Sequence, residues 1–126
     1  MSDGKNIYAF FSKSGIFCYT LSGEQLWHTL IGDESSNRQW GSAASPILLG
    51  DQLIVNASDE ARSVISLDKK TGNQLWKAEA DLTELSYGTP GIVHGTDRRE
   101  VVLAIPGEVW GLNAETGKLA WYAKTN

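Results

Sequence analysis

Hydrophobic and polar residues alternate along short segments of this chain, and turns rich in glycine separate one segment from the next. Such alternation predicts β-strands, because successive side chains of a strand point to opposite faces of its sheet. Many of these segments are also rich in β-branched and aromatic residues, which favour strands. We therefore expect an all-β fold with strands at residues 6–11, 16–21, 25–29, 45–49, 52–57, 63–68, 74–79, 89–93, 100–105, 108–113 and 118–123.

One hairpin pattern occurs three times, and a tryptophan lies on the returning strand of each copy: Trp27, Trp76 and Trp121. The copies lie about 45 to 50 residues apart, a period that indicates the blades of a β-propeller. Asp68 and Asn113 open the second and third turns, where each side chain can bond its own downstream backbone. Glycines at positions 23, 72 and 117 supply the positive φ that closes such turns. The pattern predicts architecture more directly than chemistry.

A Ser-Pro or Thr-Pro pair opens the second and third units, at residues 45–46 and 89–90. Proline lacks an amide hydrogen, so it suits the first residue of a strand. In the first unit only residues 1–5 precede the first predicted strand, and residues 2–5 resemble the turn that should follow an innermost strand. We expect one partial propeller domain over residues 1–126, with units near 1–32, 33–79 and 80–126, four-stranded antiparallel blades, and a first blade that lacks its innermost strand.

Composition and charge exclude several functional classes. The 126 residues carry a net charge of −4 and no long basic stretch, which argues against a nucleic-acid partner. No segment approaches the roughly 18 to 20 apolar residues of a membrane span, and the polar N-terminus does not have the pattern of a signal peptide. Cys18 is the only cysteine, so neither an internal disulfide nor a thiolate metal cluster is expected. His28 and His94 lack a ligand partner at metal-binding spacing.

The repeats resemble the pyrroloquinoline-quinone-like (PQQ-like) propeller family, whose blades carry an Ala-Leu-Asp-x-x-Thr-Gly-x-x-x-Trp phrase after a Ser/Thr-Pro opening. Residues 67–72 and 112–117, with Trp76 and Trp121, fit that phrase closely, and the shorter 21–23 form keeps Trp27. The resemblance covers the whole chain. It implies a piece of a larger, usually eight-bladed protein, and it suggests the bacterial periplasm or cell envelope as the location of the full-length parent.

Some members of this family are dehydrogenases that hold PQQ and calcium with a ring-stacking tryptophan and a pair of adjacent cysteines. This chain has no adjacent cysteines and no Glu, Asn and Asp set that aligns with the calcium ligands, so we expect neither PQQ nor calcium. Trp27, Trp76 and Trp121 are expected to pack between blades. The serines are scattered and the histidines have no partner for nucleophilic catalysis, which argues against an enzyme.

The connections between strands indicate where a partner could bind. We expect the Thr-Gly turns to share one end of the blades and the remaining connections, at 32–43, 57–62, 79–88 and 106–107, to share the other. Binding residues concentrate on loops held by a rigid scaffold. The candidate interaction face at the second end consists of Asp33, Glu34, Arg38, Trp40, Asp59, Glu60, Arg62, Glu84 and Tyr87. Trp40 is the first candidate contact; alternatively, it covers the adjacent blade as a structural plug.

Three functions fit these observations. The first is a non-catalytic scaffold that binds a protein or peptide; the alternatives are a fragment of a PQQ-dependent dehydrogenase and a sensory propeller that binds a sugar or another small molecule. A partial propeller also exposes the apolar sides of its end blades, and exposed surfaces of this kind mark interaction sites. Self-association into a homo-oligomer that completes the propeller is the corresponding hypothesis.

Overall fold

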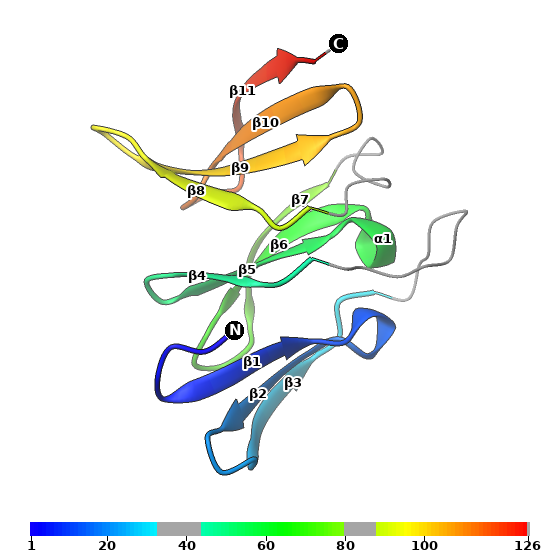
Figure 1. The fold of residues 1–126 in the computed structure, drawn as a ribbon, viewed down its shortest axis with the longest axis vertical. Helices are drawn as coiled ribbons and strands as arrows, with labels where there is room; N and C mark the ends of the chain where they lie inside the picture. Colours follow the sequence, from blue (N-terminus) through cyan, green and yellow to red (C-terminus); the bar gives the residue numbers. More distant parts are fainter. Residues whose placement is uncertain (33–43, 80–87, 126) are drawn as a thin grey trace.

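A computed structural model describes residues 1–32, 44–79 and 88–125. These residues form three antiparallel sheets stacked one above another, with the N-terminal sheet at one end of the stack and the C-terminal sheet at the other (Figure 1). We call the sheets blade 1, blade 2 and blade 3 in chain order. The expected all-β partial propeller is confirmed.

The blades follow the predicted strands closely. Blade 1 contains β1 (Asn6–Phe10), the 3-10 turn η1 (Ser12–Ser14), β2 (Ile16–Thr20) and β3 (Gln25–Thr29). Blade 2 contains β4 (Ile47–Leu49), β5 (Gln52–Ala57), the single-turn helix α1 (Ser58–Ala61), β6 (Ser63–Asp68) and β7 (Gln74–Glu79). Blade 3 contains β8 (Gly91–His94), β9 (Arg99–Ile105), β10 (Glu108–Asn113) and β11 (Leu119–Lys124). In each blade, neighbours in sequence are neighbours in the sheet.

The turn before each tryptophan strand has the predicted chemistry. Asp68 accepts a hydrogen bond from the Lys70 amide at 2.8 Å, and Asn113 accepts one from the Glu115 amide at the same distance. The glycines at positions 23, 72 and 117 all have positive φ, between 74° and 92°. A register shift follows in each hairpin, and it sets the tryptophan opposite a small residue: Cys18, Ser66 or Gly111.

Blade 2 supplies residues to both hydrophobic cores. One core joins it to blade 1 and includes Tyr8, Ile16, Leu53 and Ile65. The other core joins it to blade 3 and includes Val64, Trp76, Leu103 and Leu112, with Trp110 packed against it. Successive β6 residues therefore serve opposite cores, which explains why nearly the whole strand is buried.

Blade 1 forms a three-stranded sheet, β1-β2-β3, as predicted. Residues 1–5 turn back along β1: Ser2 forms an isolated bridge with Ile7, and the Tyr8 amide donates to the Met1 carbonyl at 2.8 Å. These residues lie on the side of β1 where β4 and β8 lie in the other blades. The predicted turn at residues 2–5 is therefore confirmed.

The expectation that every connection except the Thr-Gly turns lies at the other end of the blades is wrong for one set of turns. The turns between the first and second strands of a blade lie at the same end as the Thr-Gly turns, because strand direction reverses at every step. The Lys69 amide donates to the Asp51 carbonyl at 3.0 Å, and the Ala114 amide donates to the Arg99 carbonyl at 3.1 Å. We call this the turn end. The opposite, loop end carries η1, α1 and the 106–107 turn (Figure 1). The unit boundaries expected near residues 32 and 79 border undescribed segments and stay predictions.

Candidate interaction surface

Six residues of the predicted interaction face lie outside the described part of the chain: Asp33, Glu34, Arg38, Trp40, Glu84 and Tyr87. The other three belong to α1 or follow it at the loop end. Asp59 and Glu60 are buried, whereas Arg62 is exposed and has a left-handed backbone with φ 48°. Their role in contacting a partner stays a prediction.

Glu60 connects two blades at this end. Its Oε1 atom accepts a hydrogen bond from the Ser12 hydroxyl of η1 at 2.7 Å. The chain after β3 also passes close to α1, because a Cβ atom at Gly32 would lie 2.5 Å from the Glu60 carbonyl oxygen. The single turn of helix therefore packs against blade 1. Sequence reasoning expected these carboxylates in an open loop, because their contacts come from residues far away in the sequence.

A second polar contact at the loop end was not expected. Asn56, at the end of β5, is fully buried, and its side-chain amide donates to the Gly88 carbonyl at 2.8 Å. Its Oδ1 atom accepts from the Ser58 amide at 3.2 Å. The carboxamide thus joins the start of α1 to the segment that leads into blade 3. The only sequence signal for this contact is an Asn at the end of a predicted strand, and that residue does not identify its partner.

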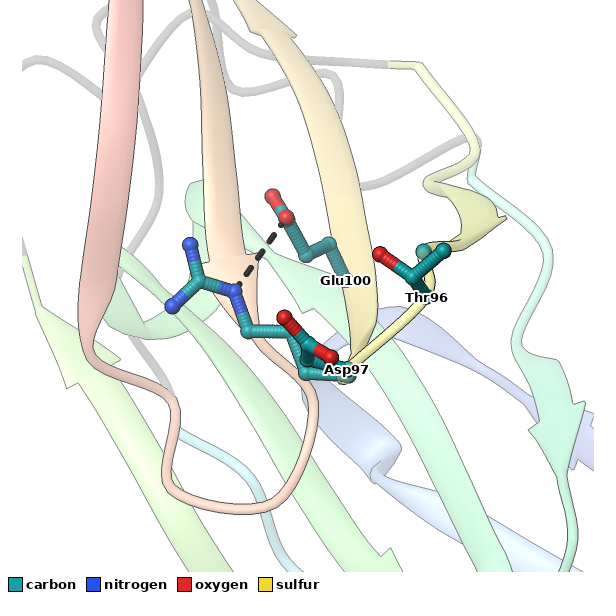
Figure 2. Close-up of a pocket in the computed structure, with 5 residues that line it drawn as sticks. Thr96, Asp97 and Glu100 are labelled. Atoms are coloured by element: carbon teal, nitrogen blue, oxygen red, sulfur yellow. Dashed lines mark hydrogen bonds and ion pairs between the residues drawn. The ribbon is translucent and has the colours of Figure 1, made fainter.

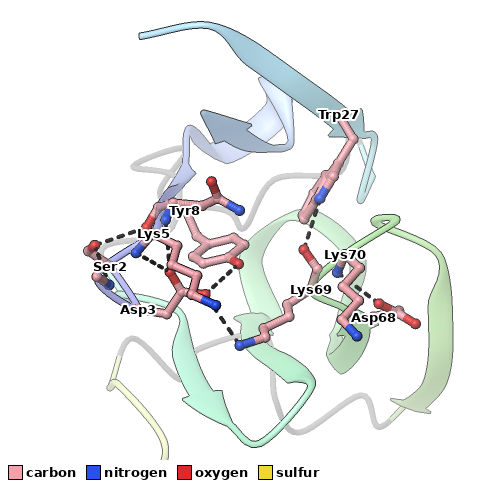
Figure 3. A network of polar contacts seen from close by, with 10 residues as sticks. Ser2, Asp3, Lys5, Tyr8, Trp27, Asp68, Lys69 and Lys70 are labelled. Atoms are coloured by element: carbon pink, nitrogen blue, oxygen red, sulfur yellow. Dashed lines mark hydrogen bonds and ion pairs between the residues drawn. The ribbon is translucent and has the colours of Figure 1, made fainter. Parts of the chain in front are cut away.

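At the turn end, Asp3 organises a polar network between blades 1 and 2 (Figure 3). Its carboxylate accepts from the amides of Lys5 and Asn6 at 2.9 and 2.8 Å, from the Tyr8 hydroxyl at 3.1 Å, and from Lys69 Nζ at 3.3 Å. The two backbone amides, Asn6 first, hold the Asp3 pKa well below its usual range. Burial, together with the bond to Asp3, raises the Tyr8 pKa to about 12. The network fixes residues 2–5 against the Thr-Gly turn of blade 2.

The same turn receives the tryptophan of the preceding blade. Trp27 Nε1 donates to the Lys69 carbonyl at 3.0 Å (Figure 3), and Trp76 Nε1 donates to the Ala114 carbonyl at 2.9 Å. Each ring also covers the glycine of that turn: a Cβ atom at Gly72 would lie 2.5 Å from Trp27 Cε3, and one at Gly117 would collide with Trp76 in the same way. The expected packing role of these two tryptophans is confirmed.

The outer face of blade 1 carries an aromatic cluster. Phe17 and Tyr19 alternate along β2 with Ile16 and Cys18, which face blade 2, so their side chains lie on the opposite side of the sheet. Phe17 stacks on Tyr19 with ring centroids 6.0 Å apart and on His28 at 4.0 Å. Phe11 contacts Phe17 edge-on and is 55% exposed. Aromatic residues are enriched at protein interfaces.

Blade 3 has the other outer face, with Trp121 on its last strand. Trp121 is 40% exposed, and its indole donates to Glu100 of its own blade. Next to this pair, the β8–β9 hairpin encloses an open hollow of about 330 Å³, lined by Gly95, Thr96, Asp97, Arg98 and Glu100 (Figure 2). Arg98 Nε lies 3.3 Å from Glu100 Oε1. The Glu100 carboxylate is therefore held by both Trp121 and Arg98.

Nothing in the described ranges forms a group of three or more His, Cys, Asp or Glu residues that could hold a metal ion. Cys18 is buried, and burial raises the pKa of its thiol, with a smaller contribution from the Asp3 charge. No helix of the described segments is long and apolar enough to cross a membrane. The chemistry that these residues do offer is apolar and aromatic contact at the two end faces of the stack.

Comparisons with known proteins identify the repeat. A family model described as outer membrane protein assembly factor BamB matches residues 1–126. None of the curated proteins matches the chain.

Among solved structures, BamB from Moraxella catarrhalis is similar over 98% of this chain and 35% of its own, at 16% identity and a TM-score of 0.74. The quinohemoprotein alcohol dehydrogenase from Comamonas testosteroni is similar over 95% of this chain and 19% of its own, at 17% identity and a TM-score of 0.70. The quinohemoprotein alcohol dehydrogenase ADHIIG from Pseudomonas putida HK5 matches 96% of this chain and 25% of its own, at 11% identity and a TM-score of 0.67. The chain thus spans about a third or less of these structures, and the similarity shows the fold.

Proposed function

Because the chain belongs to the family of PQQ-like propeller repeats described as outer membrane protein assembly factor BamB, we propose that it is a non-catalytic propeller scaffold that binds a protein or peptide. The observation that carries this proposal is the aromatic cluster of Phe11, Phe17, Tyr19 and His28 on the outer face of blade 1. Clusters of exposed apolar residues on a rigid sheet favour contact with another protein.

The loop end supplies a second part of the proposed surface. The nine residues predicted there remain candidates, and the exposed Arg62 beside α1 is the described member that can reach a partner directly. The family description places its members in outer membrane protein assembly, which supports a partner in the bacterial cell envelope and a periplasmic or envelope location for the full-length parent. We include both in the proposal.

The residues described do not fit a quinone site. Trp27 and Trp76 cover the turn glycines of the next blade and donate hydrogen bonds to its carbonyl groups. Both rings are therefore part of the contacts between blades, where a quinone ring has no place to stack. Cys18 is buried and is the only cysteine of the chain. The hollow beside Glu100 is lined by a single hairpin, which gives a small-molecule or sugar site less support than the aromatic surface gives a protein partner.

Site-specific photocrosslinking in a Gram-negative cell tests the proposal. A benzophenone amino acid replaces Phe11, and in the control it replaces Leu75 of β7, which is 50% exposed but lies away from the cluster. We expect a discrete protein adduct from position 11 and none from position 75. The same adducts from both positions, or none from position 11, would contradict a partner-binding role for this surface.

A further inference from the structure

The last strand of each blade forms one edge of its sheet. The strand orders place β3, β7 and β11 at these edges, and each pairs with a single neighbour among the described residues. We call them the outer strands. The blades contact one another through the faces of their sheets (Figure 1), so a further blade at either end of the stack would cover a face and would not pair with these edges. The open edges therefore do not depend on where the chain begins or ends.

The three outer strands differ in their protection against pairing with another strand. Proteins protect an exposed strand edge with charged side chains, lysine above all, because a charge opposes the approach of a second strand. β7 contains Lys77 and Glu79, which form an ion pair at 3.2 Å, and β11 contains Lys124. β3 reads Gln-Leu-Trp-His-Thr and has neither a charged residue nor a proline. A register shift occurs in all three hairpins, so it does not distinguish them.

β3 is also held in place on both of its faces. On the side of blade 2, Trp27 Nε1 and Thr29 Oγ1 donate to carbonyl groups of the blade 2 turn at 3.0 and 2.6 Å. On the opposite side, the His28 ring stacks on Phe17 within blade 1. A strand that is already fixed in this way loses little conformational entropy when another strand pairs with it.

The exposed side chains along this edge are apolar. Leu26 of β3 is 49% exposed, and Leu30, which directly follows the strand, is 74% exposed. In an antiparallel pair, alternate residues direct their backbone N–H and C=O groups away from the neighbouring strand. The edge of β3 thus combines a row of backbone donors and acceptors with two apolar side chains, and no charge interrupts it.

We propose that the outer edge of β3 binds an extended segment of a partner protein by strand addition. The inference rests on the proposed protein-binding function and names the conformation of the bound segment and its place on the scaffold. An extended backbone matches a row of alternating donors and acceptors, and its side chains supply the specificity. The fitting segment is apolar at alternate positions, where it contacts Leu26 and Leu30, and it contains no proline.

The test uses short peptides displayed on phage, selected on the 126-residue chain and counter-selected on Leu26→Lys, which places a lysine on the edge as β7 and β11 do. Leu75→Lys is the matched control, because Leu75 also precedes the tryptophan of its hairpin and is 50% exposed. We expect the enriched peptides to bind the wild type and Leu75→Lys equally, and Leu26→Lys with a dissociation constant at least about tenfold higher. If Leu26→Lys does not fold by circular dichroism, Leu30→Lys takes its place.

A methylation scan along the backbone of one enriched peptide distinguishes strand addition from other binding modes. N-methyl groups at one set of alternate residues remove the donors that face β3 and should abolish binding, whereas methylation of the intervening residues should leave it intact. If no peptide survives the counter-selection, or if the scan shows no such alternation, the proposal is overturned. Either result, combined with a protein adduct from position 11 in the photocrosslinking experiment, would reject strand addition and still support the proposed function.

Discussion

Gly117 and Gly107 adopt similar backbone conformations in blade 3, with φ 74° and 81°, but only Gly117 lies beneath an aromatic ring. An L-residue with positive φ costs roughly 1–2 kcal/mol, whatever surrounds it. At Gly117 an added Cβ also meets the ring of Trp76, which is itself held by its bond to the Ala114 carbonyl. Comparing substitutions at the two glycines therefore separates the free-energy cost of the turn conformation from the cost of losing the contact between blades.

We predict that Gly117→Ala lowers the free energy of unfolding by about 1–3 kcal/mol more than Gly107→Ala, since overpacking adds to the conformational strain. Urea unfolding followed by circular dichroism measures both variants under the same conditions. At Gly107 no non-neighbouring atom lies within 4 Å of the added Cβ, so that variant reports the conformational cost alone. Equal losses in the two variants would show that the Trp76 ring does not hold the turn.

Residue-scale chemistry was predictable where it is local and unpredictable where it is not. The turn roles of Asp68 and Gly72 follow from spacing within one hairpin, and both are confirmed. The burial of Glu60 depends on Ser12, which lies 48 residues earlier, and no local pattern identifies that contact. Six of the nine candidate interaction residues fall outside the described ranges, so the sequence remains the basis for their proposal.

At the scale of elements, the turn at residues 2–5 connects blade 1 to blade 2. The Asp3 carboxylate makes this connection, because it accepts hydrogen bonds from the Asn6 amide in blade 1 and from Lys69 Nζ in blade 2. The Asp3 pKa lies below its usual value of about 3.9. The folded chain therefore binds fewer protons than the unfolded chain in the acid range. The ionised carboxylate stabilises the fold above that usual value, and this contribution is lost as the pH falls through the lowered pKa of the folded state.

We predict that Asp3→Asn weakens this acid dependence. The variant removes the charge and keeps an oxygen that can accept the turn amides, so it should be less stable than the wild type at neutral pH. The difference should shrink as the pH falls below about 4, where the wild-type carboxylate of the unfolded chain takes up its proton. Urea midpoints of both proteins across this pH range measure the effect. Two parallel curves would show that Asp3 does not supply the linkage.

The strands themselves were predictable because the blades repeat one pattern: alternating residues, a turn that contains a glycine, and a tryptophan strand, with an Asx residue opening the turn in blades 2 and 3. All eleven predicted strands occur among the described residues, with bounds that differ by only a few residues. The turns between the first and second strands of a blade, by contrast, were predicted at the wrong end of the blade. The end at which a turn lies depends on strand direction through the whole sheet, as the contact of Lys69 with Asp51 shows.

At the scale of the whole molecule, a stack of repeats has a stability that depends on nearest neighbours, and the central unit has two of them. Blade 2 contributes to both hydrophobic cores, whereas blades 1 and 3 each contribute to one. The burial of individual strands follows this arrangement. Strands β5 and β6 are buried along nearly their full lengths, while every residue of β11 is exposed.

We predict that amide hydrogen exchange is slowest in β5 and β6 and fastest in β11, because local opening needs less free energy where fewer apolar contacts are lost. Exchange followed by mass spectrometry measures this gradient strand by strand. Uniform exchange across the three blades would contradict this gradient and would mean that the stack opens as one cooperative unit.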